Sequence, residues 1–290
     1  MSDLMFDLHM HSTFSDGSKT VESLIRRGRE QGLAGIAITD HDSLTQLASV
    51  RSTARELGFP VLAGVEVSTF DAESGHKAHI LAYGLSATES GDSKLERILA
   101  TTLQLRAANT LWQAWTIMRH GVSFNGRGLA LDDVIRIGSD SASVYKQHIM
   151  EALTGLPYND PEYQRVYRSL FKSGGIAQIS FPYPDTCEVI GAIRELGGHP
   201  VLAHAGQMDN WDAVPRFVEA GLEGIEVRHP DHGDAEVAQA LELAARFDLM
   251  RTGGSDYHGK FGGPTSVGCV TISADEAGEA TLALFDEEPK

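Results

Sequence analysis

The chain has 290 residues, of which 42% are hydrophobic and 22% charged, a composition typical of a globular protein rather than a disordered or fibrous one. Asp and Glu number 40 against 24 Lys and Arg, and the formal net charge of −16 disfavours binding of long nucleic acid through its phosphate backbone. The two cysteines, Cys187 and Cys269, supply neither a disulfide framework nor a zinc-ligand spacing. No basic and apolar leader and no apolar run of membrane-spanning length is present, so we expect a cytoplasmic protein without membrane contact.

Short β-rich runs alternate with amphipathic helical segments in both the first and the last third of the chain. In order, we predict strand 5–11, helix 20–32, strand 35–41, helix 43–58, strand 60–69 and strand 77–85. Later we predict helix 188–198, strand 199–205, helix 210–221, strand 224–229, helix 234–248, strand 249–256, strand 267–272 and helix 274–285. Strand 77–85 has no clear helix before it, which favours a hairpin or an irregular connection. The alternation predicts an α/β fold with a barrel-like, mainly parallel sheet.

The alternation stops between about residues 90 and 180. A long helical pattern over 95–121 is followed by further segments that favour helices. We interpret 90–180 as an inserted helical cap domain over the barrel mouth, with 1–89 and 181–290 forming the two parts of the barrel. Trp112 and Trp115 fall within the long helix beside Leu111 and Ile117, and we expect them to pack in the cap core rather than to stack on a base.

A His, Asp or Glu stands at or near the end of almost every predicted strand. His9 and His11 are two residues apart on one strand, so both side chains point to the same face. Asp16 follows in the next loop, and the other strand ends contribute His41, Glu66, His79, His204, Asp256 and His258. Because the C-terminal strand ends of an α/β barrel converge on one site, we expect these nine side chains to meet and to bind metal.

The chemistry of this set indicates the kind of metal and reaction. Imidazole and carboxylate ligands without a thiolate suit Mn²⁺, Zn²⁺ or Fe²⁺, and more than six ligands imply two or three ions. Glu66 is the natural bridge, since its two oxygens serve two cations. Clustered metals favour phosphoester hydrolysis by a metal-bridging hydroxide, with no protein nucleophile. The expected ligand is a small phosphorylated substrate, and no obligate protein partner is evident.

The motifs taken together resemble those of the PHP (polymerase and histidinol phosphatase) family. They are Asp7–Ser12, Ser15–Gly17, Thr39–Asp42, Gly64–Ser68, Ala203–His204 and Gly254–His258. The resemblance implies a distorted, TIM-like (β/α)₇ barrel with a trinuclear metal site and phosphoesterase activity. It implies three metal-binding sets, namely His9, His11, Glu66 and Asp256; Glu66, His79 and His204; and Asp16, His41 and His258.

Four residues are expected to take part in catalysis, namely Glu66, Asp256, His204 and Asp40. For Asp40 two alternatives remain open, because it could orient the imidazole of His41 or cap the helix that begins near Leu44.

The inserted helical segment is similar to that of stand-alone PHP phosphatases of nucleotides, including 3′,5′-nucleoside bisphosphates. By that similarity we predict a substrate-binding set of Lys146, His148, His232 and Arg106. Two positions depart from the family pattern, because Lys146 and Gln207 stand where relatives carry arginine. For Lys146 and Arg106 a solvated helix face remains an alternative. His229 and His232 both follow a strand, and at least one is expected to face the barrel mouth.

The leading hypothesis is therefore a hydrolase of phosphoric esters that acts on AMP-like nucleotides or 3′,5′-nucleoside bisphosphates. The alternatives are a phosphodiesterase or exonuclease of short oligonucleotide ends and a histidinol-phosphate-type phosphatase. An amidohydrolase is disfavoured because no strand-end lysine stands out. A non-catalytic metal-binding module is disfavoured because all nine ligand positions hold competent residues.

Overall fold

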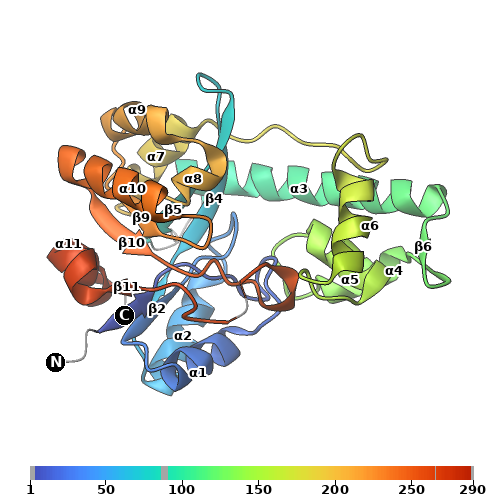
Figure 1. The fold of residues 1–290 in the computed structure, drawn as a ribbon, viewed down its shortest axis with the longest axis horizontal. Helices are drawn as coiled ribbons and strands as arrows, with labels where there is room; N and C mark the ends of the chain where they lie inside the picture. Colours follow the sequence, from blue (N-terminus) through green and yellow to red (C-terminus); the bar gives the residue numbers. More distant parts are fainter. Residues whose placement is uncertain (1–3, 86–90, 265, 289–290) are drawn as a thin grey trace.

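The structure is a computed structural model that describes residues 4–85, 91–264 and 266–288. Figure 1 shows an α/β body and a helical unit, joined by the long helix α3, which extends from the body. The first part of the body contains β1 (Met5–Asp7), α1 (Val21–Glu30), β2 (Gly35–Ile38), α2 (Leu47–Leu57), β3 (Val61–Ala63), β4 (Val65–Asp71) and β5 (His76–Tyr83). The helical unit contains α3 (Lys94–Arg119), β6 (Ser123–Phe124), β7 (Arg127–Gly128), α4 (Leu131–Ile137), α5 (Lys146–Thr154) and α6 (Pro161–Phe171). The second part of the body contains α7 (Thr186–Glu195), β8 (His199–Leu202), α8 (Ala205–Met208), α9 (Val214–Glu219), β9 (Gly224–Arg228), α10 (Asp234–Phe247), β10 (Met250–Gly253), β11 (Ile272–Ser273) and α11 (Ala274–Glu287).

The strands of the body form two sheets, with the orders β11-β1-β2-β3 and β10-β9-β8-β5-β4. The pairs β1–β2, β2–β3, β8–β9 and β9–β10 are parallel, whereas β5 is antiparallel to both β4 and β8. The α/β class is confirmed, and so is the hairpin that we expected before the strand at 77–85. The amide of Leu8 donates to the carbonyl of Gly253 at 3.0 Å and links β1 to β10. No closed sheet is recorded among the described residues, so the seven-stranded barrel stays a prediction.

Strand β2 illustrates how these strands are buried on both faces. Ile36 and Ile38 pack in the large hydrophobic cluster that the outer helices cover, whereas Ala37 packs in a second cluster between the strands. Strands buried in this way appear as continuous apolar runs, as 35–38 does in the sequence. The polar side chains are therefore found where the strands end.

The helical unit has its own hydrophobic core, which includes Ile117, Val134, Ile149, Tyr163 and Phe171. A capping box begins α3, in which Ser93 Oγ accepts from the amide of Glu96 and the Glu96 carboxylate accepts from the amide of Ser93. A separate core supports the interpretation of 90–180 as a cap, but the domain limits stay a prediction. Both residues of the predicted boundary, 89 and 90, lie outside the described residues.

The expectation for the two tryptophans of α3 is wrong. Trp112 is 44% exposed and Trp115 is 51% exposed, so neither lies in the cap core. The reason is the helical repeat. Ala114 and Ile117 lie on the face of α3 that packs into the core of the helical unit, and the two tryptophans lie on other faces. Among the described helices, none has the length and the apolar character needed to cross a membrane.

Candidate metal centre

The nine predicted ligands lie on β4 and β5 and on the loops that follow the other strands of the body. His9 and His11 come after the end of β1, although the sequence predicted a strand as far as residue 11. Met10, between them, pairs with Tyr257 in an isolated parallel bridge, which keeps the chain extended there. The side chains of His9 and His11 therefore still point to one side, as the two-residue spacing predicted.

The structure brings all nine residues together in three groups with ligand atoms within 4.8 Å of one another. The groups are His9, His11, Glu66 and Asp256; Glu66, His79 and His204; and His11, Asp16, His41 and His258. They contain the three sets that the resemblance implied, with His11 added to the third. The predicted role of each residue as a metal ligand remains a prediction.

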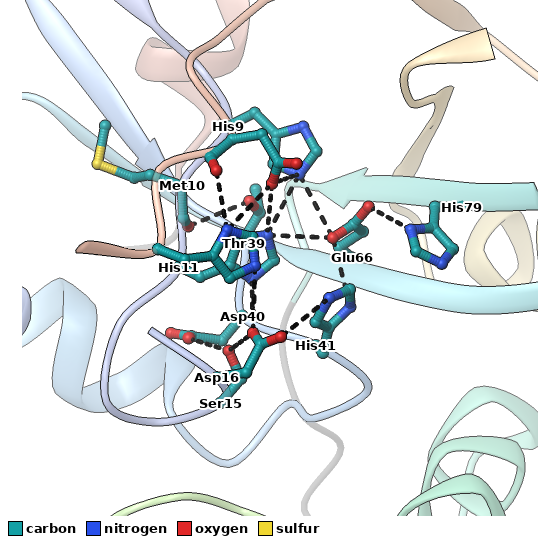
Figure 2. Close-up of polar contacts among 12 residues, drawn as sticks. His9, Met10, His11, Ser15, Asp16, Thr39, Asp40, His41, Glu66 and His79 are labelled. Carbon is teal, nitrogen blue, oxygen red and sulfur yellow. Dashed lines mark hydrogen bonds and ion pairs between the residues drawn. The ribbon is translucent and has the colours of Figure 1, made fainter. Parts of the chain in front are cut away.

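Glu66 lies at the centre of the cluster, between the imidazoles of different loops (Figure 2). Its side chain is buried, and its two oxygens face different groups. Oε1 lies 2.7 Å from His79 Nδ1 and 2.9 Å from His204 Nε2. The neighbours of Oε2 are His11 Nε2 at 3.1 Å, His41 Nδ1 at 3.3 Å and His9 Nε2 at 3.4 Å. This arrangement suits a carboxylate that bridges two cations.

The imidazoles are packed as metal ligands would be. His9 Nε2 and His11 Nε2 are 3.4 Å apart, and the rings of His11 and His258 stack with centroids 4.0 Å apart. Among the described residues, His11 Nδ1 and His204 Nδ1 are buried without a hydrogen-bond partner. Imidazole nitrogens this close to one another can share a divalent cation as ligands, whereas an apolar filling would leave them unsatisfied. The residues therefore fit Mn²⁺, Zn²⁺ or Fe²⁺.

The electrostatics favour ionised carboxylates in this buried place. Burial acts to raise the pKa of Glu66, but the imidazoles of His41, His79 and His9 outweigh it and hold that pKa well below its usual range. Burial lowers the pKa of His41 to about 4, whereas the neighbouring carboxylates raise the pKa of His11 to about 10 despite its burial. The site thus holds anionic oxygens among closely packed imidazoles, a set in which a divalent cation would take the place of the ring protons.

Glu226 is a functional residue that the sequence reasoning missed. This buried side chain on β9 lies with Oε1 3.0 Å from His9 Nδ1, and its Oε2 accepts from the backbone amide of His204 at 2.8 Å. A carboxylate on Nδ1 makes that nitrogen the donor and turns Nε2 toward the cluster. A glutamate inside the apolar run Gly224–Val227 was the signal that could have found it.

Asp40 acts on a loop rather than on an imidazole or a helix end. Its carboxylate accepts from the amide of Ser12 at 2.8 Å, from Ser12 Oγ at 2.6 Å and from Ser15 Oγ at 2.6 Å. The residue that precedes α2 is Gln46, without a side-chain cap. Both alternatives considered for Asp40 are therefore wrong, and its contacts fix the loop that carries His11 and Asp16.

The backbone is strained or crowded in the loops that carry the predicted ligand residues. His204 has φ 25° and Asp256 has φ 49°, values that non-glycine residues adopt at a cost. A Cβ at Gly254 would lie 2.3 Å from the amide nitrogen of His9, so only glycine allows this approach. The loops are thus fixed in positions that bring the side chains inward.

A cavity of about 610 Å³, which we call the metal cavity, opens onto the cluster. Besides seven of the nine predicted ligands, its lining includes Gln147, Tyr158, Tyr167, Gln207 and His229. None of the described residues that line it is a lysine or an arginine. Neutralisation of a bound anion here therefore falls to the cations that the nine residues would hold.

A second, smaller cavity of about 180 Å³ adjoins the first. We call it the cationic cavity, because positively charged side chains line it. Lys77, Arg106 and Lys146 line it, and Asp16, Gln147 and Tyr167 line both cavities. Arg106 pairs with Asp42 and donates to Ser68 Oγ at 2.9 Å. Burial lowers the pKa of Lys146 to about 8, assisted by the positive charges of nearby Lys77, Lys172 and Arg106. The alternative of a solvated helix face is therefore wrong for both Lys146 and Arg106.

Two predicted substrate residues lie away from both cavities. His148 is buried, and its Nδ1 accepts from the amide of Tyr145. His232 accepts from the amide of Gly206 at Nε2 and lies with Nδ1 3.0 Å from the carbonyl of Val227, so backbone groups occupy both ring nitrogens. His229 lines the metal cavity instead. Backbone bonds thus hold the ring of His232 beside the cavity, and its role in substrate binding stays a prediction.

The comparisons with known proteins agree with this site. The PHP domain model matches residues 7–183. A phosphoribosyl 1,2-cyclic phosphate 1,2-diphosphodiesterase from Eggerthella lenta is 43% identical, over 90% of this chain and 97% of its own. A 3′,5′-nucleoside bisphosphate phosphatase from Chromobacterium violaceum is 29% identical, over 90% of both chains. The crystal structure of a protein assigned as a metal-dependent phosphoesterase from Bifidobacterium adolescentis superimposes with a TM-score of 0.82 and 28% identity, over 98% of this chain and 96% of the other. The chain belongs to the PHP domain family, and it is a phosphoester hydrolase.

Proposed function

We propose that the chain hydrolyses a 1,2-cyclic phosphate on a ribose that carries a second phosphate group. The observation that carries the proposal is the pair of adjoining cavities, one lined by the metal-binding set and one by three cationic side chains. Such a pair suits a small sugar with two phosphate groups. The 43% identity to a phosphoribosyl cyclic phosphate diphosphodiesterase supports the cyclic ester as the reacting group.

The distribution of charge supports the same assignment. A cyclic diester carries one negative charge and a terminal phosphate monoester about two at neutral pH. The reacting diester lies in the metal cavity, whose described lining has no lysine or arginine, and the terminal phosphate lies in the second cavity. There Lys77 and Lys146 form no ion pair among the described residues, so their charges are available to the phosphate.

The three groups of ligands would hold two or three divalent ions, namely Mn²⁺, Zn²⁺ or Fe²⁺. When bound, these ions neutralise phosphoryl oxygens and lower the pKa of water. Glu66, His204 and Asp256 act by holding that charge in place. Asp40 acts one step further away, through the loop that it fixes.

His229 is placed to donate a hydrogen bond to the oxygen that leaves. Its Nδ1 accepts from the amide of Asp231 at 3.1 Å, which makes Nε2 the donor, and Nε2 lies 3.4 Å from Asp256 Oδ2 inside the cavity. Water adds to phosphorus, one P–O bond of the ring breaks, and the proton that the water gives up passes to the freed ribose oxygen, which His229 Nε2–H stabilises as a hydrogen-bond donor. The opened ring is a phosphate monoester in the same cavity, and a second hydrolysis releases phosphate.

A 3′,5′-nucleoside bisphosphate is the second candidate, because it also carries two phosphate groups on one ribose. Tyr158 and Phe261 line the metal cavity and offer aromatic faces to a base. The 29% identical bisphosphate phosphatase supports this candidate more weakly than the 43% identical relative supports the first. Either substrate is a small phosphorylated molecule.

The test is phosphate release by the Mn²⁺-loaded protein from a panel of substrates. The panel contains phosphoribosyl 1,2-cyclic phosphate, a nucleoside 3′,5′-bisphosphate, AMP, histidinol phosphate and a short 5′-phosphorylated RNA. We expect kcat/KM for the cyclic phosphate to exceed that of every other member by at least about 100-fold, which corresponds to about 2.7 kcal/mol. A preference for the bisphosphate would support the second candidate, and turnover of neither would overturn both.

A further inference from the structure

The first turn of α5 lies between the two cavities and connects them. Lys146 lines only the cationic cavity, whereas its neighbour Gln147 lines both. The side-chain amide of Gln147 donates from Nε2 to Asp16 Oδ2 at 2.8 Å. A residue of the cap thus holds a side chain that belongs to a predicted metal-binding group of the body.

The bond from Gln147 fixes the rotation of the Asp16 carboxylate. Oδ1 lies 3.3 Å from His258 Nε2 and 3.7 Å from His11 Nδ1. Among the described imidazoles, that of His41 lies within ion-pair distance of Asp16 Oδ2, with its Nε2 3.9 Å away. Gln147 is therefore the nearer partner of Oδ2 and turns Oδ1 toward the other two rings. A partner of this kind sets the orientation of a metal ligand, and its loss weakens metal binding.

Other contacts of the cap reach loops of the same metal-binding group. Tyr145 Oη donates to the carbonyl of His41 at 3.3 Å, and the amide of Ala142 donates to the carbonyl of Phe14 at 2.9 Å. The amide of Tyr158 donates to the carbonyl of Lys260, two residues after His258. The cap therefore rests on the loops that carry Asp16, His41 and His258. Among the described residues, no cap side chain bonds to Glu66, His79 or His204.

We propose that Gln147 is a positioning residue that sets the affinity of one metal position, the one formed by His11, Asp16, His41 and His258. Through Gln147, the cap that selects the substrate also completes part of the metal centre. The inference rests on the metal dependence in the proposed function but not on the identity of the substrate. The other two groups share only His11 with this position and keep their affinity when Gln147 is changed.

The experiment measures Mn²⁺ binding to the metal-free protein by calorimetric titration, with metal content checked by mass spectrometry after dialysis. Gln147→Met keeps the length of the side chain and removes the donor, and Gln147→Glu keeps the shape and presents an acceptor to Asp16. We expect one class of bound Mn²⁺ to weaken by about 10- to 100-fold in both variants, with the remaining Mn²⁺ bound as in the wild type. Gln104→Met, on the exposed face of α3, is the matched control and binds Mn²⁺ as the wild type does.

A double-mutant cycle separates this role from simple packing. In an Asp16→Asn background the metal ligand has lost its charge, so adding Gln147→Met causes no further loss of Mn²⁺ affinity. The metal-free variants should melt at the wild-type temperature, which shows that the cap remains folded.

Wild-type Mn²⁺ affinity in both Gln147 variants would overturn the inference, and so would an undiminished effect of Gln147→Met in the Asp16→Asn background. Failure of the proposed substrate has a different signature, namely no turnover of the cyclic phosphate by a wild-type protein that binds Mn²⁺ normally. A wild-type protein that binds no Mn²⁺ would overturn both proposals.

Discussion

The two cavities lie side by side and are built from different parts of the chain with different chemistry. The metal cavity is lined by His, Asp and Glu side chains on β4, β5 and the loops after the other strands of the body. The cationic cavity takes Lys77 from β5, Arg106 from α3 and Lys146 from α5. Under the proposed function, the body performs the cleavage and the cap contributes to the choice of substrate.

The two cavities also differ in how firmly their side chains are held. In the metal cavity, His9 is fixed by Glu226, and the loop of His11 is fixed by Asp40. In the cationic cavity, Lys146 forms no ion pair among the described residues, and its ammonium lies 5.6 Å from the ring centroid of Phe171. Changes in the metal cavity should therefore affect metal content and kcat, whereas changes in the cationic cavity should affect KM.

The largest effect is expected for Glu66→Gln. The substitution removes the charge that faces two metal-binding groups, and we expect kcat/KM to fall by at least about 10³-fold, equivalent to about 4 kcal/mol, together with loss of bound metal. Phosphate release and metal content measure the two effects. Glu219→Gln, on an exposed position of α9, is the control and should keep both. Full activity of Glu66→Gln would exclude a bridging role for this carboxylate.

Glu226→Gln should have the next largest effect. The carboxylate serves two donors, His9 Nδ1 and the amide of His204, whereas a glutamine has only one acceptor oxygen for them. We expect Mn²⁺ affinity to fall by about 10- to 100-fold, measured by calorimetric titration of the metal-free protein. Glu242→Gln, exposed on α10, is the control. Unchanged affinity would mean that His9 does not need its carboxylate partner.

Lys146→Met tests the cationic cavity. We expect KM for a substrate with two phosphate groups to rise by about 10- to 100-fold because a charge-assisted contact worth about 1.5–3 kcal/mol is lost, while kcat changes little. A substrate without the second phosphate should show no change. Lys94→Met, at a half-exposed position in the first turn of α3, is the control. A fall in kcat with an unchanged KM would show that Lys146 serves the reaction rather than the binding of the second phosphate.

The smallest effect is expected from pH. The ammonium of Lys146 binds phosphate and its neutral amine does not, so KM should rise about fivefold between pH 8 and pH 9 in the wild type, and the same rise should be absent in Lys146→Met. The effect of pH on folding stability has the opposite direction, because a higher pH weakens substrate binding but favours the folded state. Burial lowers the pKa in the folded state to about 8, so between pH 8 and the unfolded value of 10.5 the unfolded chain binds the proton more strongly, and stability from this group increases with pH. KM values from pH 7 to 9.5 and melting temperatures over the same range check both directions.

The sequence predicted which candidate metal ligands come together because the relevant signal is local. Strand periodicity and the positions where apolar runs end place a His, Asp or Glu at each strand end, and parallel strands bring those ends together. His9, Glu66 and Asp256 were therefore predicted to meet, and they lie in one group. The cap was visible as a loss of alternation, for the same local reason.

Only the tertiary structure decided which residues hold the set and where the substrate residues lie. Glu226 bonds to His9 from 217 positions away, and no spacing along the chain encodes that contact. His229 rather than His232 lines the cavity because backbone groups bond both nitrogens of the second ring. Likewise the packing of α3 and α5 against the body brings Arg106 and Lys146 to a separate cavity and turns Gln147 onto Asp16. Periodicity indicates the face on which a side chain lies, but the long-range packing of loops and helices selects its partner.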